Sequence, residues 1–143
     1  MFSNTVKYAI KAVLYLAAYS DESNKIMIKD IANPINVPMA YIAKILQDLS
    51  RKNLVSSKRG PKGGFYLSDN NLKGNVHDLI EAVEGDDRIS SCLLSLSECN
   101  ASNPCSLHDL AYKEKQFLMQ KLKETTLKTL AQDLKEGKTV LPL

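Results

Sequence analysis

The three cysteines of this 143-residue chain, Cys92, Cys99 and Cys105, fall within fourteen residues, and His108 follows closely behind the last of them. Thiolates and imidazole are good ligands for soft and borderline metals, so these four side chains offer a donor set to a metal ion or a metal cluster. A disulfide would use two of the thiols and leave the third over. Residues 92–108, called the cysteine segment below, are therefore predicted to bind a metal.

The spacing of the donors bears on which metal the cysteine segment holds. Structural zinc sites usually carry tight C-x2–4-C pairs, whereas six and then five residues separate the cysteines here. These longer gaps suit a bulkier iron–sulfur cluster better. Three alternatives stay open beside the cluster: tetrahedral zinc or another single metal, a redox-active pair of thiols, and thiols buried in a loop without a chemical role.

The cysteine segment ends where a long helix is expected to begin. Ser106 and Asp109 form an S-x-x-D capping signature, which predicts a helix from Ser106 to about residue 124. Cys105 is then expected just outside the helix N-terminus and His108 in its first turn. That end of a helix favours an anion, and hence the thiolate that a metal needs. The other histidine, His77, is expected to be a surface or helix-start residue and not a ligand.

The rest of the chain divides into short helices and one hairpin. Helical spacing of apolar residues predicts helices over 4–19, 27–32, 38–52 and 75–84, and a last short helix from a Thr126 cap to residue 134. The helix from residue 27 is expected to stop at Asn33, because the residue before a proline is pushed out of the helical region. Short apolar stretches at 54–58 and 65–67 have strand character, and a basic glycine-rich loop joins them.

This order of elements predicts a mainly α fold with a small β-hairpin: a winged helix-turn-helix followed by a long C-terminal dimerisation helix. If the apolar side of the third helix faces the core, its exposed side carries residues suited to reading the major groove, and the hairpin tip carries cations suited to a minor groove or phosphates. The predicted DNA-binding residues are Met39, Ala40, Tyr41, Lys44, Gln47, Arg59, Gly60 and Lys62.

Charge is divided unequally between the two halves of the chain. Residues 1–67 carry ten Lys/Arg and four Asp/Glu, whereas residues 68–143 carry nine and twelve. A basic N-terminal half joined to an acidic C-terminal half is typical of a nucleic-acid-binding module with a sensing or assembly module. A winged-helix adaptor for proteins would not need the basic half. DNA binding that weakens steeply with salt separates these two classes.

Other classes of protein are disfavoured by what the sequence lacks. No apolar run approaches the roughly 20 residues that span a bilayer, and the N-terminus has no signal-peptide pattern, so we expect a cytoplasmic protein without membrane contact. Three cysteines fit a reducing compartment. The chain has no nucleophile elbow, no dinucleotide fingerprint and no HExxH motif, so an enzyme is not expected.

The sequence resembles the BadM/Rrf-type winged helix-turn-helix transcriptional regulators, a family with IscR-like, NsrR-like and CymR-like members. The resemblance covers nearly the whole chain. It is carried by Tyr8-Ala9, Tyr41, Asn53-Leu54-Val55-Ser56-Ser57, the Arg59-Gly60-Pro61-x-Gly63-Gly64 wing, Val83-Glu84-Gly85 and the three cysteines. The wing motif together with three cysteines is a specific combination.

The resemblance implies a homodimer built on the long C-terminal helix, a palindromic DNA operator and, in cluster-bearing members, an iron–sulfur cluster. A 2Fe–2S cluster is favoured and 4Fe–4S is possible, with zinc as the alternative. In IscR-like members a histidine three residues after the last cysteine completes the ligands, and His108 stands there. Some NsrR-like members use an acidic residue near the start of the first helix, where this chain has Lys7. CymR-like members lack the cysteines.

The resulting hypothesis is a dimeric regulator, most simply a repressor, whose operator binding is modulated by an iron–sulfur cluster or the thiol state of the cysteine segment. The alternative is a winged-helix regulator with structural zinc or redox thiols, or one signalled by a protein partner without any metal. Three functional parts are expected: a DNA-binding domain over residues 1–72, a connecting helix and sensor loop over 73–105, and a dimerisation helix with its tail over 106–143.

Overall fold

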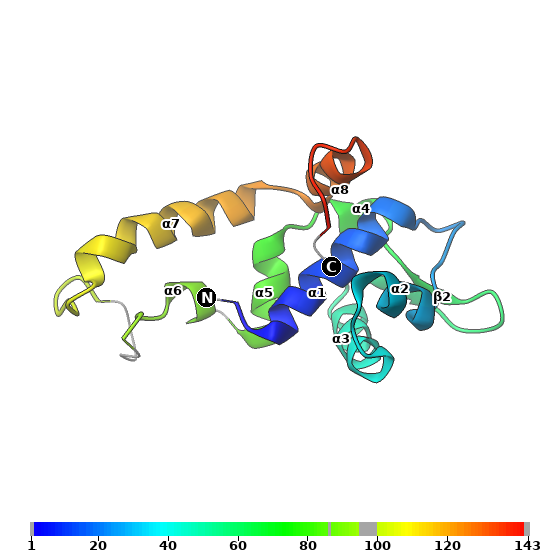
Figure 1. Ribbon diagram of the computed structural model, residues 1–143, viewed down its shortest axis with the longest axis horizontal. Coiled ribbons are helices and arrows are strands. Elements are labelled where there is room, and N and C mark those ends of the chain that lie inside the picture. Colours follow the sequence, from blue (N-terminus) through cyan, green and yellow to red (C-terminus); the bar gives the residue numbers. More distant parts are fainter. Residues whose placement is uncertain (1, 86, 95–99, 142–143) are drawn as a thin grey trace.

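The computed structural model describes residues 2–85, 87–94 and 100–141. Within them the chain is mainly helical, with one two-stranded hairpin, as the sequence predicts (Figure 1). The elements in chain order are α1 (Asn4–Tyr19), α2 (Ile28–Ile35), α3 (Met39–Arg51), β1 (Ser56–Lys58), β2 (Gly64–Tyr66), α4 (Asp69–Leu72), α5 (Val76–Glu84), α6 (Asp87–Ser90), α7 (His108–Glu124) and α8 (Leu127–Lys135).

Helix α1 is the centre of the hydrophobic core. It contacts α2, α3, α5 and α8, so it is covered on several sides. Ser3 caps its first turn by accepting a hydrogen bond from the backbone N–H of Val6. Its buried residues recur along the whole helix; they are Val6, Ala9, Ala12, Val13, Leu16, Ala17 and Ala18. Small alanines among them let the neighbouring helices approach closely.

Helix α2 runs further than the sequence predicted. It continues through Pro34 to Ile35, whereas the proline was expected to stop it at Asn33. A proline in the last turn removes only its own N–H from the helix, and the preference of the preceding residue is a bias that packing overrides. Asn36 ends the helix in the left-handed conformation, with φ of 55°.

The hairpin forms the wing. Strands β1 and β2 pair antiparallel with Ser57 opposite Phe65, and Ile26 adds a backbone bridge to Phe65 from the other side. Gly64 is required at this point. It has φ of +149°, and a Cβ there would lie 2.7 Å from the carbonyl oxygen of Ile26. Gly64, the last glycine of the wing motif, therefore allows a close backbone approach at the base of the hairpin.

Helix α4 was not expected from the sequence, and its buried Asn71 is a polar hub beneath the wing. The side-chain oxygen of Asn71 accepts hydrogen bonds from Ser56 Oγ at 2.7 Å and from the backbone N–H of Ser68 at 2.9 Å. Its amide nitrogen donates to the carbonyl of Asn53 at 3.0 Å. One side chain thus joins the end of α3, the first strand of the wing and α4.

Replacing Asn71 with alanine is expected to lower the free energy of unfolding by about 1–3 kcal/mol, because it leaves buried hydrogen-bonding groups without their partner. Chemical denaturation followed by circular dichroism measures the change. The matched control is Asn70→Ala, a neighbouring asparagine whose side chain is exposed, which we expect to change stability by about 0.5 kcal/mol or less. Equal stabilities of the two variants would contradict the role of Asn71 as a hub.

The C-terminal part of the chain leaves the core and returns to it. Helix α7 extends away from the rest of the molecule beside α6, and α8 then packs against α1 (Figure 1). Thr126 caps α8 as predicted, and the backbone N–H of Leu127 donates to the carbonyl of Gly74 at 2.8 Å. None of the described helices is long and apolar enough to cross a membrane.

Candidate functional site

Helix α3 presents two different faces. Ile42, Ile45, Leu46 and Leu49 are buried in the core, each 7% exposed or less. The predicted recognition residues lie on the other side, and all of them are exposed: Met39, Ala40, Tyr41, Lys44 and Gln47. Small and polar side chains on an exposed helix of a helix-turn-helix are suited to the major groove. The structure therefore makes this face available, as the sequence predicted.

Tyr41 differs from the other recognition residues because it is also tied to α1. Its hydroxyl lies 2.5 Å from Thr5 Oγ1, and its ring meets the ring of Tyr8 edge-on, with centroids 5.6 Å apart. Tyr41 therefore holds the first turn of α3 against α1. It remains 43% exposed, so this fixed ring still borders the exposed face.

The wing tip displays the predicted cations. Arg59, Gly60 and Lys62 are exposed, and the tip is closed by a hydrogen bond from the N–H of Gly63 to the carbonyl of Gly60 at 2.9 Å. Gly60 has φ of +110° with open space around it, a backbone conformation that glycine adopts without strain. The tip is thus a tight basic turn with room for a ligand to approach its backbone.

A groove between α3 and the wing brings further cations into this surface. It has a volume of about 420 Å³, and its lining includes Gln47, Arg51, Lys58 and Arg59. Arg51 and Lys58 were not among the predicted contacts. Arg51 follows Lys44 by seven residues, so helical spacing alone places the two on one face. Lys58 stands next to Arg59 in the sequence, and only the hairpin pairing shows that it faces the same groove.

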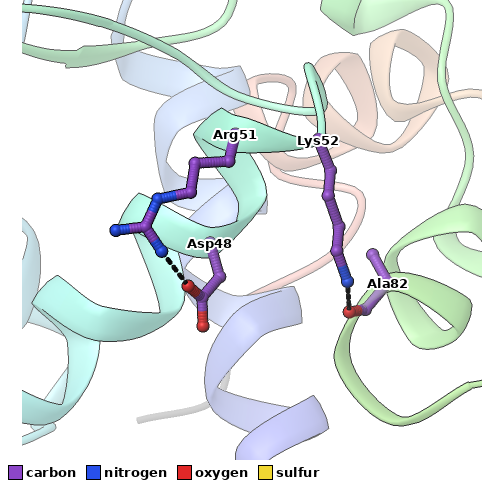
Figure 2. Close-up of polar contacts among 4 residues, drawn as sticks. All are labelled: Asp48, Arg51, Lys52 and Ala82. Atoms are coloured by element: carbon purple, nitrogen blue, oxygen red, sulfur yellow. Dashed lines mark hydrogen bonds and ion pairs between the residues drawn. The ribbon is translucent and has the colours of Figure 1, made fainter.

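Two polar contacts lie at the C-terminal end of α3, one within the helix and one to α5 (Figure 2). Arg51 pairs with Asp48 at 2.9 Å, an exposed ion pair of small energetic value. Lys52 donates instead to the backbone carbonyl of Ala82 in α5. Helix α3 is thereby joined directly to α5, the helix that leads into the cysteine segment.

Of the described donors of the cysteine segment, Cys92 follows α6, Cys105 precedes α7 and His108 is the first residue of α7. Cys92 is buried, at 6% exposure, and its Sγ accepts a hydrogen bond from the N–H of Leu94 at 3.4 Å. Cys105 is half-buried, and His108 is buried at 6% exposure, with its ring stacked on Tyr112 at 4.7 Å. Cys99, the fourth predicted ligand, lies outside the described residues.

Helix α7 begins two residues later than the capping signature predicted. The N-cap is Leu107, which makes no side-chain capping bond, so the predicted role of Ser106 as the cap is wrong. The N–H of His108 donates to the carbonyl of Cys105 at 3.0 Å, and this turn takes the place of the expected capping box. Cys105 nevertheless stands just ahead of the helix and His108 in its first turn.

The donor set fits an iron–sulfur cluster by its chemistry, since three thiols and an imidazole are ligands that iron–sulfur centres use. Among the described residues, Cys92, Cys105 and His108 do not come together as a set of ligand atoms within 4.8 Å of one another. The donors of a tetrahedral zinc ion would be closer than that, about 3–4 Å apart. A ready-made zinc site is therefore not formed by these three residues.

His77 was expected at a surface or a helix start. It does lie in the first turn of α5, but it is buried at 8% exposure. Its Nδ1 lies 3.4 Å from a carboxylate oxygen of Glu81, and Asp78 brings a third ligand atom within 4.8 Å of both. Neighbouring carboxylates around one histidine of a single helix are common without a metal, so His77 remains a residue of the helix start.

Apolar side chains form a stripe along α7, and the structure divides them between an exposed and a half-buried face. Leu110 and Phe117 are 74% and 66% exposed, which is unusual for large apolar side chains on one face of a helix. The other members of the stripe, Leu107, Ala111, Leu118 and Leu122, are half-buried. The exposed apolar face thus consists of Leu110 and Phe117, with Leu93 and Leu94 also more than half exposed before the helix.

Comparison with known proteins identifies the family of the chain. The family model of Rrf2, described as an iron-dependent transcriptional regulator, matches residues 2–133. A putative HTH-type transcriptional regulator of Aquifex aeolicus is 35% identical over 132 residues, which cover 91% of this chain and 90% of that protein. The HTH-type transcriptional repressor NsrR of Streptomyces coelicolor is 26% identical over 69% of this chain and 62% of its own length.

Solved structures show the same fold. CymR, the global cysteine regulator of B. subtilis, superposes with a TM-score of 0.75 at 24% identity and covers 92% of this chain and 96% of its own. IscR of T. potens superposes with a TM-score of 0.71 at 23% identity and covers 98% and 92%. The family model that matches residues 2–133, together with the 35% identity to the regulator of Aquifex aeolicus, shows that the protein is a member of the Rrf2 family of transcriptional regulators.

Proposed function

We propose that this Rrf2-family regulator is a homodimeric repressor that binds a palindromic DNA operator and responds to an iron–sulfur cluster in its cysteine segment. The observation that carries the DNA-binding part is the basic surface of α3 and the wing: Arg51, Lys58 and Arg59 line one groove between them. Lys44 of α3 and Lys62 of the wing tip add two exposed cations on the same two elements. The regulator would bind its operator in the cytoplasm.

Binding to a short duplex that carries the operator tests this part directly. Fluorescence anisotropy at several salt concentrations is expected to show an affinity that falls steeply with salt, because each phosphate contact releases counterions and contributes about 0.9 to the logarithmic slope. The operator sequence itself is found by selection from a random duplex library. A protein that selects no sequence and binds duplex DNA equally at low and high salt would contradict the proposal.

Replacing Arg59 with alanine is expected to weaken operator binding by about 1–3 kcal/mol if the side chain touches bases, since it stands at the edge of the exposed wing tip. Anisotropy at fixed salt measures the change. The matched control is Lys128→Ala, which removes one exposed cation from α8, far along the chain from the wing. The role of Arg59 fails if both variants keep the affinity of the unmodified protein.

For the cluster we propose Cys92, Cys99 and Cys105 as thiolate ligands and His108 as the ligand through a ring nitrogen. Two observations support this choice: the chemistry of the donor set, and the burial of Cys92 and His108 away from bulk water. When bound, the cluster supplies a redox-active and labile group, because a histidine ligand is easily protonated. Cys92 and Cys105 would fix the two ends of the segment, and His108 would tie it to the start of α7.

A series of contacts within the protein connects the proposed cluster site to the DNA-binding surface. Helix α5 leads into α6 and Cys92, and its Ala82 carbonyl receives the side chain of Lys52 at the end of α3. A change in how the segment packs on α7 would therefore shift α5 and, through Lys52, the recognition helix α3. A bound cluster can change operator affinity only if the loaded and cluster-free states of the protein differ in their contacts. We expect the contacts between the cysteine segment, α5 and α3 to differ between these two states.

Anaerobic purification with visible absorption and assays of iron and sulfide tests the cluster. We expect iron and sulfide in the purified protein. Zinc without sulfide would establish the alternative, a regulator with a structural metal. Neither metal nor sulfide would leave the thiols or a protein partner as the source of the signal.

A further inference from the structure

Lys115 is a buried lysine on the face of α7 that turns toward the rest of the molecule. It is only 6% exposed, and its ammonium group donates to the backbone carbonyl of Ser91. No carboxylate within the described part of the chain pairs with it. An ammonium group that is removed from water and bonded to a neutral carbonyl is costly unless some negative charge compensates it.

The position of Lys115 points to what that negative charge is. Ser91 directly precedes Cys92, which is buried as well, so the contact joins α7 to the start of the cysteine segment across 24 positions of sequence. His108 lies on the same buried face of α7, seven residues earlier, which is roughly 10 Å along the helix. The cation therefore stands beside one proposed ligand and two turns from another.

We propose that Lys115 is a positioning and charge-compensating residue of the cysteine segment. It holds the backbone next to Cys92 against α7, and it balances the negative charge of the thiolates when the segment carries its cluster. This inference rests on the proposed function of the segment. Three thiolates more than cancel the positive charge of an oxidised 2Fe–2S core, and reduction adds an electron. Because net charge sets the reduction potential of such clusters, a nearby cation raises it.

A purely structural role for Lys115 makes a different prediction. Ser91 follows the short helix α6, and lysines often bond the last carbonyls of a helix. A cap of that kind would affect the order of the segment but not the potential of the cluster. The two roles are separated by measuring both properties in the same set of variants.

The experiment uses the full chain with Lys115 changed to methionine, glutamine or arginine. Methionine removes the charge and the donor, glutamine keeps a donor without the charge, and arginine keeps both. The matched control is Lys113→Met, which removes an exposed lysine from the same helix. Mediated redox titration gives the midpoint potential of the loaded protein. Hydrogen exchange of the Leu94 amide, which donates to Cys92 Sγ, reports the order of the segment in the cluster-free protein.

We expect a more negative midpoint potential in Lys115→Met and Lys115→Gln, and a potential near that of the unmodified protein in Lys115→Arg and Lys113→Met. We expect exchange of the Leu94 amide to be about tenfold faster or more in Lys115→Met, because a hydrogen bond from a charged group is lost. If the methionine variant fails to fold, the glutamine and arginine variants carry the comparison.

Faster exchange with an unchanged potential would overturn charge compensation and leave Lys115 as a helix cap. Unchanged exchange and an unchanged potential would overturn both parts of the inference while the proposed function stands. An unmodified protein that takes up no iron and sulfide would instead overturn the proposed function, and this inference would fall with it.

Discussion

Replacing Phe117 with aspartate is expected to turn the proposed dimer into a monomer at micromolar concentration and to abolish operator binding at physiological salt. Phe117 is 66% exposed on α7 although it is large and apolar, and α7 extends away from the core (Figure 1). Aromatic residues at the centre of an interface commonly contribute 2 kcal/mol or more. A carboxylate in the same place would have to be buried without a partner.

The loss of DNA binding follows from the loss of the second half-site. A monomer contacts one half of a palindrome, and the avidity of two linked modules is worth about 10²- to 10⁴-fold in affinity. Sedimentation velocity measures the assembly, and anisotropy with the selected operator measures the affinity. The control is Gln116→Asp, which places the same charge on the exposed residue directly before Phe117 in α7. A Phe117→Asp protein that still sediments as a dimer would show that the interface lies elsewhere.

Replacing Cys105 or Cys99 with alanine is expected to remove the cluster and to shift operator affinity to that of the cluster-free protein. A switch of this kind typically changes affinity by about 1–3 kcal/mol, or roughly 5- to 150-fold. The control is Ser102→Ala, an exposed residue between the two cysteines that offers no metal ligand. Visible absorption with iron and sulfide assays measures the cluster, and anisotropy compares loaded and cluster-free proteins on one operator.

Two results would contradict this mechanism in different ways. An alanine variant that retains a full cluster would show that the substituted cysteine is not a ligand. Loaded and cluster-free proteins that bind every selected operator equally would show that the cluster does not regulate DNA binding. The proposal for the DNA-binding surface would survive either result, because it depends on α3 and the wing and not on the cysteine segment.

Local patterns in the sequence were enough to predict the helix-turn-helix and the wing. The buried side of α3 repeats at helical spacing, and the glycines of the wing motif stand where the backbone must turn or approach Ile26 closely. Such features depend on residues near one another in the chain, so residue types and the helical spacing of apolar residues are enough to predict them. The exposure of the recognition residues followed once the buried side was known.

Features that arise from packing between distant segments were predicted poorly. The sequence did not indicate helix α4, whose Asn71 is held by contacts to residues 15 and 18 positions away. The continuation of α2 past Pro34 was missed because core packing outweighs a local bias. The capping signature at Ser106 matched a common pattern, yet the turn from Cys105 to His108 begins the helix instead.

The family, most of the helical and hairpin elements and the set of possible metal ligands could be predicted from the sequence, because each depends on residue types at short spacing. How these parts meet depends on contacts between distant segments of the folded chain. In the fold, Lys115 contacts the residue before Cys92, and Lys52 contacts α5. Phe117 is exposed, whereas Leu122 packs partly buried against the core. Which side of a helix is buried depends on the elements that pack against it, and α7 packs against α5 and α6.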